Sequence, residues 1–191
     1  MLNDQFAVLK RDYGAININL TLAGTDRTVN SNWANNPHQV AMRKALRKGT
    51  YADINIYIVK NIGMEGAGTI IGLCGLPFPV TPGSDDFWND GCLVHFDAVP
   101  GGRFGGWNGG RVATHEVGHW FGLLHTFEGG CDGAGDFISD TPAEAGPGSG
   151  CSNVIDSCPN QPGVDPVFNY MDYTGESVPI ELPSLRIPCL G

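Results

Sequence analysis

Three histidines and one glutamate fall within eleven residues, HEVGHWFGLLH at positions 115–125. His115 and His119 are four residues apart, so on an α-helix their imidazoles lie on one face, one turn apart, and can bind a single cation. Neutral imidazoles suit zinc, and three protein ligands with one open position are typical of a catalytic zinc site. The spacing therefore predicts a zinc-binding helix.

The third ligand must come from beyond that helix. Gly122 accepts a positive φ at no steric cost, so the helix can end there and the chain can turn back toward the metal, which brings in His125. Glu116, next to the first ligand, is placed to hold a zinc-bound water, take its proton and pass it to a leaving amine. The predicted chemistry is hydrolysis of an amide bond.

The alternative explanation is a chance arrangement of polar residues on a helix surface. An HExxH pair alone is only suggestive, but here five fixed positions recur over eleven residues. Their apolar neighbours indicate a largely buried helix: Val112, Val117, Trp120, Phe121, Leu123 and Leu124. Three histidines and a glutamate inside a buried helix need a partner to offset their desolvation, which favours the metal site.

Helices and strands must position this segment. Apolar residues recur at helical spacing near the start (2–14) and in HQVAMRKALRKG, which predicts a helix over 38–48. Alternation predicts strands in AININLTLAG (15–24), ADINIYIVKNI (52–62) and DGCLVHFDAV (90–99). Strands separated by helical segments predict a mixed sheet covered by helices. From about residue 129 Gly, Pro, Asp and Ser dominate, and this part is expected to be loop.

Composition excludes several classes of protein. A chain of 191 residues, 41% of them apolar, can bury a core but is short for two enzymatic domains, so one domain is expected. The net charge of −9 argues against a nucleic-acid partner. A cluster of Arg43, Lys44, Arg47 and Lys48 is interpreted as a solvated helix face. With no run of eighteen apolar residues and no signal-peptide pattern, a soluble chain without a membrane partner is expected.

The six cysteines contain no CxxC pair, which argues against a zinc ribbon and against an intracellular redox motif. Disulfides are therefore expected, and with them an oxidising compartment.

At this point the sequence resembles the metzincin peptidases, whose signature HExxHxxGxxH is matched at every fixed position. The segment NYMDY (169–173) resembles the methionine turn of that clan, with Met171 forming an apolar floor under the ligands. Tyr173 matches a tyrosine that in several metzincin families reaches the metal or the developing oxyanion. The alternative for Tyr173 is a buried aromatic residue with a satisfied hydroxyl.

Among metzincins the chain is similar to the pappalysin family, and in particular to its small secreted fungal and bacterial members. The similarity covers nearly all of the first 174 residues, including the stretches LNDQFAVLKRDYG, HTFEGGC, GDFISDTPAE and NYMDYT. It implies an α+β fold in one catalytic domain over 1–191. An upper subdomain (about 1–125) would hold a twisted, mixed, mainly parallel sheet and two long helices, and a lower loop-rich subdomain (about 126–191) would lie across a substrate cleft.

The resemblance also implies function: a secreted zinc-dependent endopeptidase acting on proteins or peptides, as a monomer, whose signal and pro-segments are not in this chain. The family pattern implies a disulfide between Cys131 and Cys158, and a second disulfide is expected between Cys74 and Cys92. For Cys151, Cys189 is the remaining candidate partner.

Calcium is often bound in the lower subdomain of this family, which points to four oxygen-bearing residues: Asp132, Asp136, Asp140 and Thr141. An equally good explanation is a solvated acidic loop with Asx turns. Glu176 lies where the family often has an acidic residue near the pocket for the side chain after the scissile bond, which suggests a preference for Arg or Lys there.

The match breaks after Thr174, where the chain reads GESVPIELPSLRIPCLG and lacks the cysteine-containing segment and final helix of the family. A second hypothesis therefore stays open, in which the protein keeps its zinc site but is an inactive binding or decoy module, or a truncated variant. The intact Glu116 favours the enzyme.

Overall fold

The computed structural model describes residues 1–36, 38, 40–65, 68–148 and 155–176. Its α-helices are α1 (Leu2–Gly14), α2 (Ser31–Asn35), α3 (Val40–Leu46), α4 (Asp85–Asn89) and α5 (Arg111–Trp120). Its strands are β1 (Ile56–Val59), β2 (Met64–Glu65), β3 (Gly68–Thr69), β4 (Gly72–Cys74) and β5 (Cys92–His95), and two 3₁₀ helices are η1 (Phe96–Ala98) and η2 (Gly130–Asp132).

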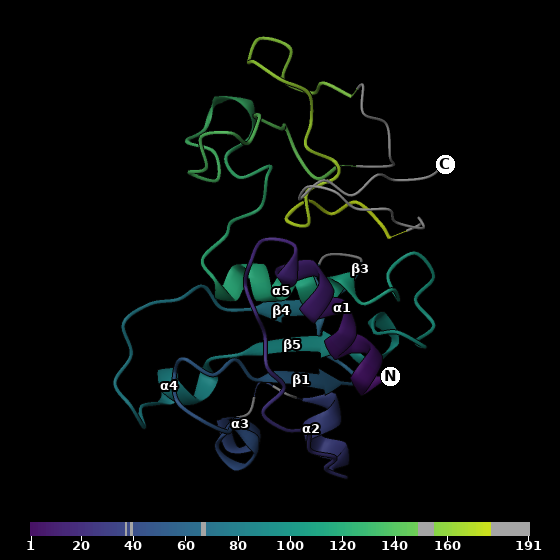
Figure 1. Cartoon of the computed structure of the whole chain (residues 1–191), viewed down its shortest axis with the longest axis vertical. Helices are drawn as coiled ribbons and strands as arrows, with labels where there is room; N and C mark the ends of the chain where they lie inside the picture. The colour runs from purple at the N-terminus through teal and green to yellow at the C-terminus, as the bar shows by residue number, and fades with distance from the viewer. Residues whose placement is uncertain (37, 39, 66–67, 149–154, 177–191) are drawn as a thin grey trace.

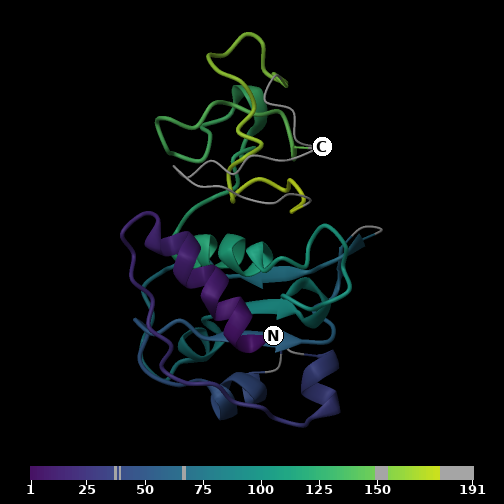
Figure 2. The same ribbon diagram turned by 45° about the vertical axis from the view of Figure 1, so that its right-hand side comes forward.

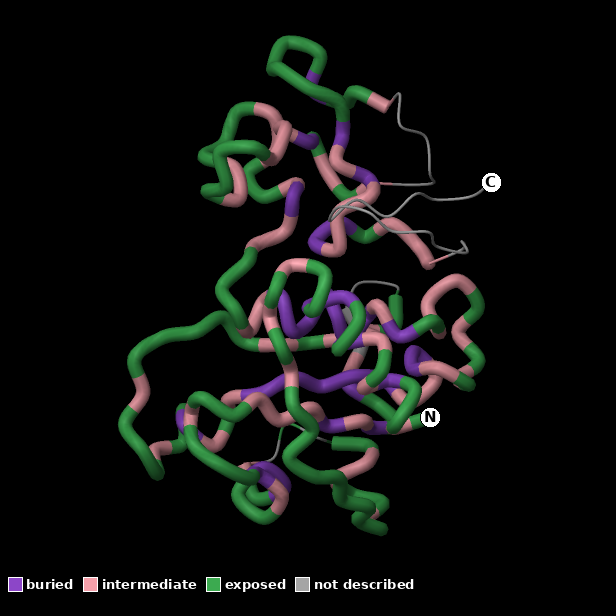
Figure 3. Tube along the Cα trace, in the orientation of Figure 1, coloured by how far each residue is buried: buried purple, intermediate pink, exposed green. Residues whose placement is uncertain are grey.

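A three-stranded mixed sheet lies at the centre, in the order β1-β5-β4 (Figure 1). β1 runs parallel to β5, and β4 runs antiparallel to it with Cys74 opposite Cys92. The fold is α+β, as expected, and the described part of the sheet has one parallel and one antiparallel pair. All four residues of β5 are buried (Figure 3), because helices cover both faces of the sheet.

Two apolar clusters lie on opposite faces of the sheet. On one face α1 and α5 pack against β5 through residues that include Leu9, Val94 and Val117. On the other face α3 packs through Met42 against Tyr57 and other residues of the second cluster. Turning the molecule shows α1 running diagonally from α5 across the front of the strands, with α2 and α3 below the strands (Figure 2). The helix that carries the histidines is therefore held against a buried sheet.

The strand predicted over 15–24 is absent, since none of these residues pairs with a described strand. Asn17 has a φ of 63°, which interrupts the extended conformation that a strand needs. The alternating apolar residues Ile16, Ile18 and Leu20 nevertheless pack against the cluster around α1 and α5. The alternation identified the buried side of the segment correctly but not its secondary structure.

The interpretation of the basic cluster as a solvated face was wrong for two of its four members. Arg43 and Arg47 are buried, whereas Lys44 and Lys48 are exposed. Arg43 donates to the carbonyl of Asn89, and the Arg47 guanidinium lies 2.8 Å from the Asp90 carboxylate. Both arginines therefore connect α3 to the loop before β5, which a pattern of charges along one helix could not reveal.

Beyond α5 the described chain contains η2 and otherwise turns and loops, which fill the upper part of Figure 1. A disulfide joins Cys131 to Cys158 across this region, and another joins Cys74 to Cys92 in the sheet. Both are pairings expected from the sequence, while Cys151 and Cys189 lie outside the described residues. None of the described helices is long and apolar enough to cross a membrane.

Candidate metal centre and cleft

The helix α5 ends where its sequence indicates. Gly122 has a φ of +96°, and its amide donates to the His119 carbonyl while the Leu123 amide donates to the Gly118 carbonyl. These two bonds form a Schellman motif, in which a left-handed residue satisfies the last carbonyls of a helix. The chain then reverses and returns His125 toward the helix.

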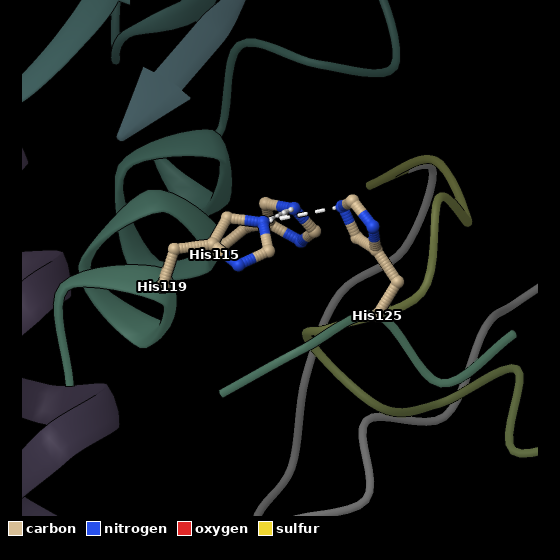
Figure 4. Close-up of side chains that lie close together, drawn as sticks. All are labelled: His115, His119 and His125. Atoms are coloured by element: carbon tan, nitrogen blue, oxygen red, sulfur yellow. Dashed lines mark hydrogen bonds between the residues drawn. The ribbon is translucent and has the colours of Figure 1, made fainter. Parts of the chain in front are cut away.

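The three histidine side chains converge on one point (Figure 4). The Nε2 atom of His119 lies 3.1 Å from Nε2 of His115 and 3.1 Å from Nε2 of His125. Among the residues that the structure describes, only these three form a group of His, Cys, Asp or Glu side chains whose ligand atoms all lie within 4.8 Å of one another. The geometry brings together the three predicted ligands.

The far nitrogens of two rings are bound to the backbone. Nδ1 of His115 lies 2.6 Å from the Tyr170 carbonyl and Nδ1 of His119 lies 2.8 Å from the Leu123 carbonyl, so both rings donate there and turn unprotonated Nε2 atoms inward. Burial lowers the pKa of His115 to about 3 and of His125 to about 4, and it also lowers that of His119. All three rings are neutral near pH 7, which is the form that binds zinc.

Glu116 is buried beside these rings and lines the same cleft. Burial raises the pKa of its carboxyl to about 8, against the opposing effect of a hydrogen bond from the Cys74 amide. A general base works best when its pKa is near the working pH. The group therefore fits a role in moving a proton near neutral pH.

Met171 and Tyr173 both lie close to the histidine-bearing segment. Met171 is buried, and a Cβ placed on Gly118 would come within 2.4 Å of its Sδ, so the methionine packs directly against the glycine of HEVGH. Tyr173 is 46% exposed as a residue, and the centroid of its ring lies 4.8 Å from that of His125. Its exposure disagrees with the alternative of a buried aromatic residue.

Several supporting residues were missed by sequence reasoning. The buried carboxylate of Asp12 accepts a hydrogen bond from Thr114 Oγ1 (2.8 Å) and is hydrogen-bonded to the side chain of Tyr170, whose carbonyl binds His115. Glu144 accepts a bond from Thr126, the neighbour of His125. Nothing in the local sequence around Asp12 or Glu144 marks these contacts, because the partners are distant along the chain.

Glu176 lines the cleft, and its carboxylate forms hydrogen bonds within the protein itself. It accepts hydrogen bonds from the amides of Gly109, Arg111 (2.6 Å) and Val112 (3.1 Å). Gly110, the first residue before α5, contributes no side-chain cap, so Glu176 satisfies the free amides at the start of α5 from 65 residues away along the chain. The pKa of the Glu176 carboxyl is raised, mainly by burial.

The residues suggested for calcium stay a prediction. Among the described residues, Asp132, Asp136 and Asp140 form no group of three carboxylates with oxygen atoms within 4.8 Å of one another. Asp136 accepts a hydrogen bond from the Ile138 amide, the contact of an Asx turn.

The cleft around the histidines has a volume of about 820 Å³ and an edge formed by residues 68–74. Its other walls come from α5 and from the segment after Val167, which also carries Met171 and Tyr173. This volume is large enough for a peptide side chain, and the strand β4 is part of the lining.

A family model, curated relatives and solved structures all match this chain, and the matches agree on a metalloprotease family. Residues 102–180 match the M43 peptidase family, described as Pregnancy-associated plasma protein-A. Extracellular metalloproteases of Neurospora crassa and Sordaria macrospora are 53% and 52% identical to this chain over 174 residues, which are 91% of the chain. The chain spans 59% of the length of each of these two relatives.

A solved structure shows the same fold. Mature mirolysin of Tannerella forsythia, in complex with a cleaved peptide, is 35% identical and superposes with a TM-score of 0.51. The match covers 67% of this chain and 47% of mirolysin.

Proposed function

This chain belongs to the pappalysin family of metzincin peptidases, and on that premise we propose that it is a zinc-dependent metalloendopeptidase that hydrolyses peptide bonds in proteins. The observation that carries the proposal is the convergence of three neutral imidazoles beside a buried carboxyl in one cleft. His115, His119 and His125 would hold the zinc. A zinc ion held there would supply Lewis acidity, which would lower the pKa of a water molecule and polarise a scissile carbonyl.

Glu116 is the proposed proton carrier. Its carboxylate takes a proton from the attacking water and delivers it to the leaving amine, so that the new C–O bond and the broken C–N bond are balanced by one transferred proton. Burial limits the access of bulk solvent to this carboxyl and raises its pKa.

Tyr173 is proposed to donate a hydrogen bond to the oxyanion that develops on the scissile carbonyl. Its ring lies against His125 and is half exposed to the cleft, which suits contact with substrate. Tyr173→Phe should lower kcat while zinc content stays unchanged. An unchanged kcat would leave Tyr173 with a packing role only.

The substrates would be proteins or peptides that enter the cleft in an extended form. A preference for Arg or Lys after the scissile bond stays a prediction, based on the carboxylate of Glu176 in the cleft wall. Three backbone amides and the nearby Arg111 already offset its charge, so we expect the preference to be modest. A peptide library without enrichment of basic residues at that subsite would reject the prediction.

The remaining proposals concern the whole protein. The names of the fungal relatives support secretion, and the disulfides fit an oxidising compartment. We also propose a monomer with one catalytic domain, to be tested by size-exclusion chromatography with light scattering.

Calcium binding stays a prediction. A rise in thermal stability with added calcium, lost in Asp132→Ala and Asp140→Ala, would support it, and the absence of such a rise would reject it.

Casein digestion by the wild type and by Glu116→Ala, each with and without a chelator, tests the enzyme proposal. The wild type should cleave casein, lose activity with the chelator and regain it with added zinc. Glu116→Ala should bind zinc but lose about 10²–10⁴-fold in kcat. Equal, chelator-insensitive activity in both proteins would refute the proposal. A wild type that binds zinc but does not cleave would instead support the binding or decoy hypothesis.

A further inference from the structure

The carboxylate of Glu116 rests on the edge strand β4. Successive residues of a strand point to opposite faces, so Gly72 and Cys74 share the face that packs against α5, while Leu73 points away and is 43% exposed. Glu116 lies on α5 and is buried at that contact. Two of the three residues of β4 therefore face the proposed base.

Gly72 leaves the space that the carboxylate fills. A Cβ on this residue would lie 2.2 Å from Glu116 Oε1 and 2.7 Å from its Cδ, well inside van der Waals contact. Gly72 has no positive φ to explain its identity, so the reason for glycine here is the approach of the carboxylate. Any larger residue would have to displace the end of the Glu116 side chain.

Cys74 and its disulfide partner Cys92 both contact Glu116. The Cys74 amide donates a hydrogen bond to the Glu116 carboxylate. Cys92 Sγ lies 3.4 Å from the Glu116 carbonyl oxygen, and Cys92 is fully buried. The disulfide thus cross-links β4 to β5 where both half-cystines contact Glu116.

β4 has few other constraints. It is three residues long, it pairs with β5 and with no other strand of the described residues, and all three of its residues line the cleft. A short edge strand is easily displaced, and the disulfide is its covalent connection to the buried centre of the sheet. Movement of β4 would carry the Cys74 amide away from the carboxylate that it binds.

We propose that Gly72 and the Cys74–Cys92 disulfide are positioning elements for Glu116, which fix the carboxylate against β4 in the orientation used for proton transfer. The proposal rests on the enzyme function proposed above. It predicts that catalysis depends on this disulfide being oxidised, through the position of Glu116 and not through zinc binding, because neither element contacts the three histidines in the interactions described.

The first experiment compares two glycine variants in the zinc-loaded full chain. Gly72→Ala should lower kcat by about 10²-fold, the effect of displacing a catalytic group by about 1 Å, with little change in KM or zinc content. Gly75→Ala is the matched control, since a Cβ there meets no atom within 4 Å, and it should keep the wild-type kcat. Equal kcat values for Gly72→Ala and the wild type would overturn the proposal.

The second experiment does not depend on activity. In thermal unfolding of the zinc-loaded protein, Gly72→Ala should lower Tm in the wild-type background but much less in the Glu116→Ala background, because removal of the carboxylate removes the overlap. The same Tm shift in both backgrounds would overturn the proposed contact. These results stand apart from the enzyme proposal, which is judged by casein cleavage and zinc content of the wild type alone.

The third experiment removes the cross-link. The Cys74→Ala/Cys92→Ala variant should lose kcat while its folded fraction binds one zinc, whereas Cys131→Ala/Cys158→Ala should keep the kcat of its folded fraction. A loss of activity that only follows the loss of folded, zinc-loaded protein would contradict the role of the disulfide. If the first variant does not fold, the two glycine comparisons decide the proposal.

Discussion

Replacing Gly118, the glycine of HEVGH, by alanine has two opposing effects on stability: a gain in helix propensity and an overlap of the new methyl group with Met171. In an ordinary exposed helix, Gly→Ala stabilises by about 1 kcal/mol, because alanine loses less backbone entropy on folding. In α5 the new Cβ would lie 2.4 Å from Met171 Sδ and 3.3 Å from its Cε, and Met171 is only 4% exposed. The methionine would have to move by about 1 Å to reach ordinary contact distance.

Overpacking of this kind costs about 1–3 kcal/mol, which is more than the gain in helix propensity. Gly118→Ala should therefore be destabilising by up to about 2 kcal/mol, or a fall of about 2–4 °C in Tm for each kcal/mol in a chain of this size. Met171→Ala alone should cost about 2–5 kcal/mol through the cavity that it leaves. In that background the overlap is gone, and Gly118→Ala should become stabilising.

The assay is a double-mutant cycle by denaturant unfolding of zinc-loaded protein, with zinc content measured for each variant. Gly14→Ala at the end of α1 is the control, since its Cβ would meet no atom within 4 Å. The sign of the Gly118→Ala effect should reverse between the two Met171 backgrounds and stay constant for Gly14→Ala. If Gly118→Ala were stabilising by the same amount in both backgrounds, Met171 would not be packed against this helix as described.

Three further predictions concern carboxylates outside the zinc ligands. Glu176→Ala should lower the free energy of unfolding by about 1–2 kcal/mol, because the amides at the start of α5 lose their acceptor. Glu176→Gln keeps an acceptor oxygen and should lower it less. Equal losses of stability in the two variants would contradict the capping role. Burial raises the pKa of the Glu144 carboxyl to about 7, so the stability that its protonated form contributes is present at low pH and is lost as pH rises through about 7. The stability of Glu144→Gln relative to the wild type should therefore increase between pH 5 and 8. A difference that stays constant over this range would refute the prediction. Asp90→Ala should cost about 3–5 kcal/mol in denaturant unfolding because buried Arg47 loses its counter-ion, and a cost below 1 kcal/mol would show that Arg47 is solvated in solution.

Local sequence was sufficient where the relevant contacts are close along the chain. The spacing of His115 and His119, the turn at Gly122 and the return of His125 depend on helix geometry and on the conformational freedom of glycine, both of which act over a few residues. The approximate positions of α1, α3, β1 and β5 followed from apolar periodicity for the same reason, whereas the α+β class was implied by the family resemblance.

Contacts between distant segments were decided by the tertiary structure. The alternation of 15–24 indicated a strand, but pairing needs a neighbouring strand, and this segment packs on the sheet face without one. The charges of Arg43 and Arg47 indicated a solvated face, but their burial is stabilised by carbonyls and a carboxylate more than 40 residues away.

The sequence by itself therefore determined which residues can bind zinc and which can move a proton, since side-chain chemistry and helical spacing are local properties. The tertiary structure decided what holds those residues in place: the peptide carbonyl and buried Asp12 behind His115, the amide and glycine of β4 against Glu116, and the carboxylate of Glu176 at the start of α5. Their partners lie tens of residues away, and they come together only because α1, the sheet and the segment after Val167 all pack around α5.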